Sequence, residues 1–441
     1  MTTILRRNLS TPQLVTVEAR KIRPSPSSLP MRSSPVSRTE SMAYPSTRRW
    51  PYLLRRNDTK AFLATLAFCT LVWVLASDSV HDWRRESAHV SVRGSSSASS
   101  SSWGGAVRPG YFRLPPPSSH IPFAAITDLD QLSRIEGGDK PQFRSLLAPG
   151  TLQVLNNNRY EITFAPETRT LTTKHNEAGR GAEFSELTLY QNRLLTFDDR
   201  TGDVFEILNT DGTSSFVVPR FVVTEGNGET DKGMKWEWAT VKQNELYMGS
   251  MGKEYTRPDG SVLNRNNLWI GILNANGDLR REDWTERYKL VRQALNAWNP
   301  GYLIIEAVLW SDALQKWVFL PRRISHEMYD EHADEQMGGH QLVLVDDKFT
   351  TTTVVDIKME SLDGLKGFSS FAFVPGTGDK HALAIRSVEE DCVDDLAQCK
   401  QRAYMLVFNV LTGEVLSEEV KIPGNFKYEG VEFVDLSVVP K

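Results

Sequence analysis

The chain has 441 residues, which is long for one ordinary domain, although a large all-β barrel or propeller can use this length as a single domain. Its formal net charge of −4 conceals an asymmetry. Residues 1–60 hold twelve Lys or Arg and three Asp or Glu, whereas residues 61–441 hold 39 basic and 52 acidic residues. The acidic body argues against nucleic acid as the main partner and suits a protein that binds cations.

An uncharged apolar run stands out near the N-terminus. Residues 61–76 read AFLATLAFCTLVWVLA, and with Ser77 the run reaches about 17 residues, the low end for a helix that spans a bilayer. Basic residues cluster before the run and Asp78 follows it, so the positive-inside rule places residues 1–60 in the cytosol and the body in a lumen. No convincing small-residue cleavage site follows Ala76, which favours an uncleaved anchor over a signal peptide.

The composition predicts four segments. They are a disordered basic cytosolic tail at 1–60, a transmembrane signal anchor at 61–77, a stalk rich in Ser and Pro at 78–120, and a folded body at 121–441. A short span suits the thinner membranes of the early secretory pathway, so we expect a single-pass type II membrane protein of the Golgi or endoplasmic reticulum. A mitochondrial presequence is the competing interpretation, because the tail is rich in Arg and Ser, but a presequence does not explain the apolar run.

Two of the three cysteines lie in a hydrophilic loop of the body. Cys392 and Cys399 flank the sequence VDDLAQ, a spacing that could close a small disulfide in an oxidising lumen. The alternative is a pair of free surface thiols. The two cysteines are too far from any other Cys or His cluster to indicate a zinc site.

Short apolar or alternating runs recur through the body, and long amphipathic patterns are scarce. The runs lie at 123–126, 187–190, 194–197, 246–248, 268–273, 317–320, 341–345, 371–374, 382–385 and 405–410. Only 284–298 has a helical pattern. Many short strands with turn residues between them predict an all-β sandwich, barrel or propeller.

Five of the strand-like sites share one plan, in which an acid or a hydroxyl sits in an apolar frame. They read FSEL, WEW, IEA, FSSF and YEGV, and the intervals between their polar residues are 52, 69, 63 and 60 residues. A period of this size fits a four-stranded blade with long loops, so the spacing predicts a five-bladed β-propeller. The fifth site lies too near the end of the body for a whole blade, so we expect the strand around 123–129 to complete that blade and close the ring.

In a propeller the innermost strands line a central channel, so equivalent positions of all blades face one point. Here that point would receive the side chains of Ser185, Glu237, Glu306, Ser369 and Glu429. Three carboxylates and two hydroxyls, without His or Cys, make a hard oxygen site that suits Ca²⁺. The competing interpretation is that each side chain is the solvent-facing alternate of a half-buried strand.

A second layer of charged residues is expected on the loops at the same mouth of the ring. They are Asp128, Asp130, Arg180, Glu183, Asp198, Asp199, Arg200, Lys253, Glu254, Arg322, Arg323 and Arg386. Arginines bind phosphate oxygens in pairs, and carboxylates near a metal-bound phosphate can orient a water molecule. The mixture favours hydrolysis of a phosphoanhydride, although some of these charges are expected to form surface salt bridges, Arg323 and Asp198 first. P-loop, GxSxG and HExxH patterns are absent from the sequence, which excludes the commoner hydrolase classes.

Several runs resemble the calcium-activated nucleotidase (apyrase) family. They are ITDLD, GRGAEFSELTLY, DDRTG, DKGMKWEWATVK, MGKEY, GYLIIEAVLWSD, WVFLPRR, GFSSFAF and KYEGVEF, and they cover about 120–435 in the family's order. The resemblance implies a five-bladed propeller with one central Ca²⁺. It also implies hydrolysis of nucleoside di- and triphosphates, with UDP and GDP as good substrates. The anchor and tail match the layout of the family's membrane-bound vertebrate form.

The resemblance places the calcium ligands on the five positions given above. It places active-site acids and bases on Asp128, Asp130, Glu183, Asp199, Arg200, Glu254, Arg322 and Arg386. The chain departs from the family at Ala182 and Glu186, where Met and Asp are frequent, and at Arg386, where Lys is common. None of these changes removes an expected ligand, but they leave the preference among nucleotides open.

Two other functions remain open at this point. The body could be a calcium-stabilised binding propeller without activity, against which the many charged loop residues argue. It could also be another calcium-dependent propeller hydrolase, such as a lactonase, although those sites favour Asn and Asp over Ser and Glu. The sequence leaves the oligomeric state open, and a homodimer is one option.

Overall fold

The computed structural model describes residues 112–138, 140–257, 259–393 and 398–439. The predicted tail at 1–60, the anchor at 61–77 and residues 78–111 of the predicted stalk lie outside these ranges. Within them, no helix is long and apolar enough to cross a membrane. The anchor and the location in the secretory pathway therefore stay predictions.

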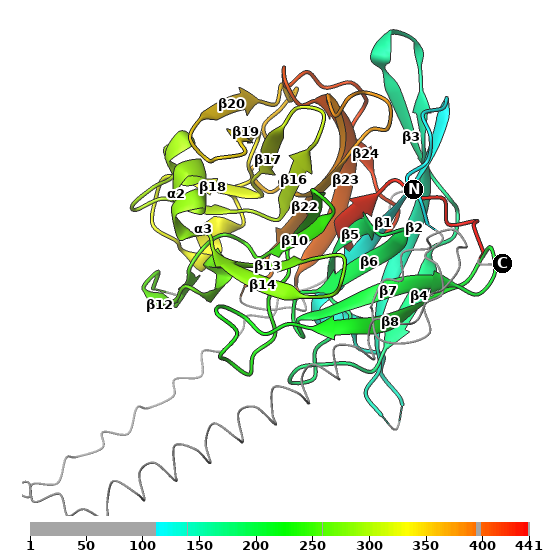
Figure 1. Cartoon of the computed structure of the whole chain (residues 1–441), viewed down its shortest axis with the longest axis horizontal. Helices are drawn as coiled ribbons and strands as arrows, with labels where there is room; N and C mark the ends of the chain where they lie inside the picture. The colour runs from blue at the N-terminus through cyan, green and yellow to red at the C-terminus, as the bar shows by residue number, and fades with distance from the viewer. Residues whose placement is uncertain (1–111, 139, 258, 394–397, 440–441) are drawn as a thin grey trace, which may run out of the picture. The chain divides into compact units, whose positions relative to one another are not determined.

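The described chain forms five antiparallel sheets that surround a common centre (Figure 1). From the innermost strand outward, the first four contain β5 (Phe184–Tyr190), β6 (Arg193–Asp198), β7 (Asp203–Asn209) and β8 (Ser215–Val222); β9 (Trp238–Lys242), β10 (Glu245–Gly249), β13 (Trp269–Leu273) and β14 (Leu279–Asp283); β16 (Ala307–Ser311), β17 (Lys316–Leu320), β19 (Gln341–Asp346) and β20 (Thr352–Asp356); β21 (Gly367–Phe373), β22 (His381–Glu390), β23 (Lys400–Asn409) and β24 (Val420–Lys421). The predicted all-β, five-bladed propeller is confirmed.

The fifth sheet joins the two ends of the body. Its innermost strand is β25 (Lys427–Glu432), which is followed outward by β1 (His120–Asp128), β2 (Phe143–Val154) and β3 (Tyr160–Phe164), while β4 (Arg169–Thr173) also pairs with β2. Ala125 lies opposite Val431 in the antiparallel β1–β25 pair. The prediction that an N-terminal strand completes the last blade is therefore confirmed.

Smaller elements lie in the loops between the blades. Two short hairpins pair β11 (Tyr255–Thr256) with β12 (Val262–Asn264) and β15 (Tyr302–Ile304) with β18 (Arg323–Ser325). The helices are α2 (Thr285–Ala294), α3 (Glu331–Asp334) and the 3₁₀ turns η1 (Asp130–Ser133), η2 (Asn156–Asn158) and η3 (Asn266–Leu268). The helix predicted at 284–298 is thus present but shorter, since the chain turns at Asn296, which has a φ of 55°.

The core is divided among the interfaces between neighbouring blades. Five buried apolar clusters occur, and each joins the facing sides of two adjacent sheets. In β1, for example, Phe123 and Ala125 pack against the β21–β24 sheet, whereas Ala124 and Ile126 pack against the β5–β8 sheet. Because successive side chains of a strand point to opposite faces, a strand between two neighbours is buried on both. This explains why the inner runs are almost continuously apolar.

Glycine at position 430 lets the ring close at its centre. The innermost strands contact one another in the cyclic order β5, β9, β16, β21, β25 and back to β5. A Cβ atom on Gly430 would lie only 2.6 Å from the backbone carbonyl carbon of Glu186 in β5. The absence of a side chain therefore allows the last inner strand to pack against the first.

We expect Gly430→Ala to destabilise the protein by about 1–3 kcal/mol, because overpacking against a backbone forces the strands apart. Thermal or urea unfolding of the variant and the unaltered protein measures the effect. Gly212→Ala is the matched control, since its added Cβ would meet only the Ser437 carbonyl oxygen, at 3.7 Å. Equal stability of the Gly430 variant and this control would contradict the closure argument.

Candidate active site

Local strand geometry aims the five predicted ligand positions at the centre of the ring. In three blades the position is the extra residue of a β-bulge between the two inner strands. These residues are Ser185, Ser369 and Glu429. In the other two blades, Glu237 and Glu306 come directly before the first residue of β9 and β16. A bulge leaves one residue out of the ladder and re-aims its side chain, so the repeated position has a structural cause.

The three carboxylates of this set meet in one pocket. Glu237, Glu306 and Glu429 are all buried and line a pocket of about 250 Å³. The two serine hydroxyls lie in the same ring of positions but bond to neighbouring backbone. Ser185 donates to the Trp236 carbonyl oxygen at 2.6 Å, and Ser369 donates to the Tyr428 carbonyl oxygen at 2.9 Å. The serines thus link adjacent blades beside the pocket.

Arg322 binds three of the carboxylates around the pocket. Its Nη1 lies 2.5 Å from Glu306 Oε2 and 2.8 Å from Glu429 Oε1, and its Nη2 lies 2.6 Å from Glu389 Oε2. The side chain of Arg322 is only 4% exposed. These contacts join the blades that supply β17, β22 and β25.

Two lysines complete the balance of charge. Lys427 Nζ lies 2.6 Å from Asp128 Oδ2, 3.0 Å from Asp130 Oδ2 and 3.4 Å from both Glu389 Oε1 and Glu429 Oε1. The second lysine, Lys235, lies 2.6 Å from Glu237 Oε1 and also pairs with Asp199. The pocket lining contains seven carboxylates and six cationic side chains. Such a mixture can hold a cation and a polyanion together.

The pKa shifts show how strongly the carboxylates are crowded. Burial and the neighbouring Glu306 raise the pKa of Glu237 to about 8, against the opposing effect of Lys235. Burial also raises the pKa of Glu429 well above its ordinary value. At Glu389, burial acts in the same direction but is outweighed by Lys427 and the arginines, which lower the pKa to about 2. Site carboxylates without enough cationic contact therefore resist ionisation.

A second acidic cluster lies beside the pocket. One carboxylate oxygen each of Asp128, Glu183 and Asp199 lie within 4.8 Å of one another, and all three residues are buried. Burial, Asp128 and Asp199 raise the pKa of Glu183 to about 9, although Arg180 donates to its carboxylate at 2.8 and 2.5 Å. Asp199 Oδ1 is buried and has no hydrogen-bond partner in the described structure. An orphaned carboxylate oxygen within an all-oxygen donor set fits a hard divalent cation.

The arginines predicted to bind phosphate do not all reach the pocket. Arg200 lines it, and its Nε is buried without a hydrogen-bond partner among the described residues. Arg322 lines it as well. Arg386 instead lies outside the lining and donates from Nη1 to Glu419 Oε1 at 2.8 Å and from Nη2 to the Lys366 carbonyl oxygen at 3.2 Å.

Glu254 also lies apart from the axial pocket. Its carboxylate pairs with Arg292 at 3.0 Å and lines a separate pocket with Lys253. Asp130, by contrast, lines the axial pocket and accepts hydrogen bonds from Arg180 at 3.3 Å and from Gln401 at 2.7 Å. The structure therefore gathers Asp128, Asp130, Glu183, Asp199, Arg200 and Arg322 at or beside one site, and it leaves Glu254 and Arg386 away from it.

The expectation that Arg323 and Asp198 form surface salt bridges is wrong. Arg323 is 2% exposed, lines the axial pocket and lies 3.7 Å from Asp334. Asp198 is fully buried and accepts hydrogen bonds from the backbone amides of Ala182, Arg200 and Thr201 at 2.8, 2.9 and 3.2 Å. Asp198 therefore shapes the loop that presents Asp199 and Arg200 to the site.

Sequence analysis missed Lys235 and Lys427 as site residues. Each lies two positions before a pocket glutamate, in the pairs Lys235/Glu237 and Lys427/Glu429. Residues two apart in an extended chain point to the same side, so the repeated Lys-x-Glu spacing was a usable signal. Glu389 was noticed as a charge after a strand, but its role requires the β22–β23 hairpin to reach the centre.

Comparisons with known proteins agree with this geometry. The model of the family described as Apyrase matches residues 129–434. Apyrase of Cimex lectularius is 41% identical over 262 residues, which cover 59% of this chain and 68% of that protein. Soluble calcium-activated nucleotidase 1 of Rattus norvegicus is 36% identical over 312 residues (70% and 73%), and Apyrase apy-1 of Caenorhabditis elegans is 36% identical over 310 residues (70% and 82%). The chain therefore belongs to the apyrase family, an enzyme family that hydrolyses nucleoside phosphates.

Proposed function

We propose that the chain hydrolyses nucleoside di- and triphosphates, with UDP and GDP among its substrates, to nucleoside monophosphate and phosphate in a Ca²⁺-dependent reaction. The observation that carries this proposal is the alternation of buried carboxylates and cationic side chains around one small pocket. A site for a free anion needs no cluster of acids, and a site for a free cation needs no arginines. Both are required for a cation–polyphosphate complex.

Calcium would be held by Glu237, Glu306 and Glu429, with the hydroxyls of Ser185 and Ser369 beside them. When bound, it supplies positive charge that neutralises phosphate oxygens and strengthens the electrophilic phosphorus. The names of the relatives that mention calcium activation support this assignment, as does the buried, all-oxygen donor set.

The protein's own residues perform the remaining work. Arg200 and Arg322 bind oxygens of the terminal phosphate and hold it for attack. Asp128 and Glu183 orient a water molecule in line with the scissile bond, and one of these carboxylates takes a proton from that water as the new phosphorus–oxygen bond forms. The nucleoside monophosphate leaves directly, without a phosphoenzyme. Asp130 and Lys427 position Asp128 through the contacts described above.

The cellular role follows from the predicted anchor at 61–77. A lumenal enzyme with this activity would remove the UDP and GDP that glycosyltransferases release, and so would support glycosylation. The apolar run and the charge asymmetry around it support this topology.

The purified body is expected to release phosphate from UDP and GDP with Ca²⁺, and to release far less with EGTA. ADP and Mg²⁺ complete the comparison, because they test the nucleotide and cation preferences. Phosphate release by a colorimetric assay is the measurement. No release from any of the three nucleotides in Ca²⁺ would sink the nucleotidase proposal.

Glu237→Gln is expected to lower activity by about a hundredfold or more, since it removes one carboxylate of the proposed cation site. It should also abolish the Ca²⁺-dependent rise in melting temperature, which reports cation binding to the folded state. Glu161→Gln is the control, because Glu161 is an exposed residue of β3. Retained activity together with retained calcium stabilisation would refute the assignment.

For the topology, the body is expected to resist added protease in intact microsomes and to be digested after detergent treatment. Immunoblotting against the body measures this. Digestion without detergent would place the body on the cytosolic side and would contradict the proposed role in the lumen.

A further inference from the structure

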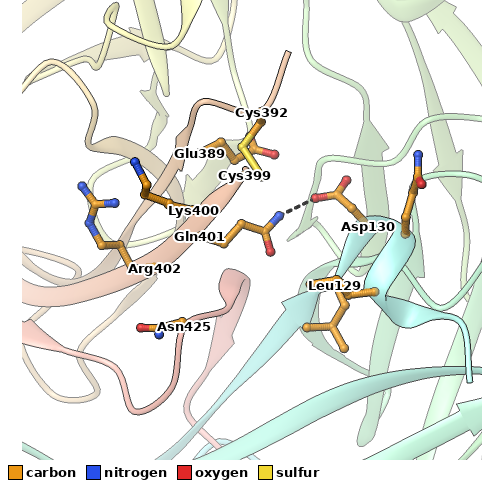
Figure 2. Close-up of a pocket in the computed structure, with 11 residues that line it drawn as sticks. Leu129, Asp130, Glu389, Cys392, Cys399, Lys400, Gln401, Arg402 and Asn425 are labelled. Atoms are coloured by element: carbon orange, nitrogen blue, oxygen red, sulfur yellow. Dashed lines mark hydrogen bonds between the residues drawn. A yellow bond between two sulfur atoms is a disulfide. The ribbon is translucent and has the colours of Figure 1, made fainter. Parts of the chain in front are cut away.

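A second, larger pocket opens directly beside the axial pocket (Figure 2). It has a volume of about 810 Å³, and Asp130 and Glu389 line both pockets. Volumes of this order are usual for sites that enclose small organic ligands. A substrate whose phosphates occupy the axial pocket would therefore extend naturally into this space.

One wall of this second pocket is the tip of the β22–β23 hairpin. A disulfide joins Cys392 to Cys399 there and confirms that predicted pairing. Just inside it, Glu389 lies opposite Gln401 in the strand register. Glu389 contacts Arg322 and Lys427 of the axial pocket, whereas Gln401 contacts Asp130. The wall is thus tied to the residues proposed to act on the phosphates.

Gln401 offers an unused hydrogen-bond acceptor. The residue is 8% exposed, and its Nε2 donates to Asp130 Oδ2 at 2.7 Å, which fixes the orientation of the amide (Figure 2). Its Oε1 is buried and has no hydrogen-bond partner among the residues described. Since buried acceptors are normally satisfied, this oxygen calls for a donor on the missing occupant.

The other features of the pocket suit a neutral, partly apolar group. Leu132 of η1 lines it and is 63% exposed, which is unusual for a large apolar side chain. The basic residues of the opposite wall are already compensated, since Arg402 pairs with Glu390 and Lys400 pairs with Asp391, both at 2.7 Å. The pocket therefore does not demand a second polyanion.

We propose that this pocket binds the nucleoside part of the substrate. Leu132 contacts the flat base, and Gln401 Oε1 accepts a hydrogen bond from a ribose hydroxyl or from a base N–H group. This inference rests on the proposed function, because it assigns the second half of the same substrate. The disulfide acts as a positioning device that holds the Glu389–Gln401 pair between the two halves of the site.

The test compares ligands with and without a nucleoside. Leu132→Asn, which keeps the size but removes the apolar surface, is expected to raise the KM for UDP and the inhibition constant of UMP by about three- to tenfold. The inhibition constant of imidodiphosphate, which has no nucleoside, should stay unchanged. Leu263→Asn is the matched control, because Leu263 is 58% exposed on β12, outside the lining of this pocket. Inhibition by UMP with none by imidodiphosphate would also support the proposal.

A second variant tests the acceptor. Gln401→Met is expected to raise the KM for UDP by about tenfold, the usual effect of leaving a ligand donor unpaired. If the ribose supplies the donor, 2′-deoxy-UDP should bind the unaltered protein more weakly than UDP and bind the variant equally well. If the base supplies it, the two nucleotides should respond alike.

Failure of this inference can be separated from failure of the proposed function. An unaltered protein that releases no phosphate from UDP contradicts the nucleotidase proposal itself. An active protein in which Leu132→Asn and Gln401→Met change imidodiphosphate and UMP inhibition equally, or change neither, contradicts only the nucleoside pocket.

Discussion

The centre of this protein is governed by the need to neutralise carboxylates that the ring gathers out of water. An unpaired buried charge costs several kcal/mol, and removing one partner of a buried pair is correspondingly destabilising. Arg322 and Lys427 meet this requirement by binding acids from several blades at once. The apolar clusters join neighbouring sheets in pairs, whereas these ion pairs join sheets across the centre. Charge neutralisation and ring assembly are therefore the same structural problem.

The repeated position on the inner strands shows how the fold produces the site. A regular strand alternates its side chains between the two blade interfaces and leaves none for the centre. The bulges at Ser185, Ser369 and Glu429 break this alternation once per blade. The price is one unpaired residue in each ladder, and the return is a polar side chain directed inward. Glu237 and Glu306 reach the same place by preceding their strands.

Much of this arrangement could be predicted from the sequence, because it depends on local pattern and spacing. The interval between inner strands indicated five blades, and the shortness of the last repeat indicated closure by β1. The pairing of charges was less accessible. Arg323 and Asp198 look like surface residues in sequence, but their burial depends on loops that fold over them. Lys235 and Lys427 are recognisable only when two blades are compared. Glu254 follows the expected order, yet the hairpin of β11 and β12 and the helix α2 carry its surroundings away from the centre, where Arg292 binds it.

The pairing of β25 with β1 also has a consequence for biosynthesis. Glu429, Lys427 and the inner edge of the closing blade come from the strand that follows all other inner strands in the sequence. Four inner strands can be made and exposed before this one leaves the ribosome, but without it the acids and arginines of the centre lack their last partners. A nascent chain would thus present an open ring with an incomplete charge network to the chaperones around it. Enzymatic competence would arise in one late step, after translation has passed β25.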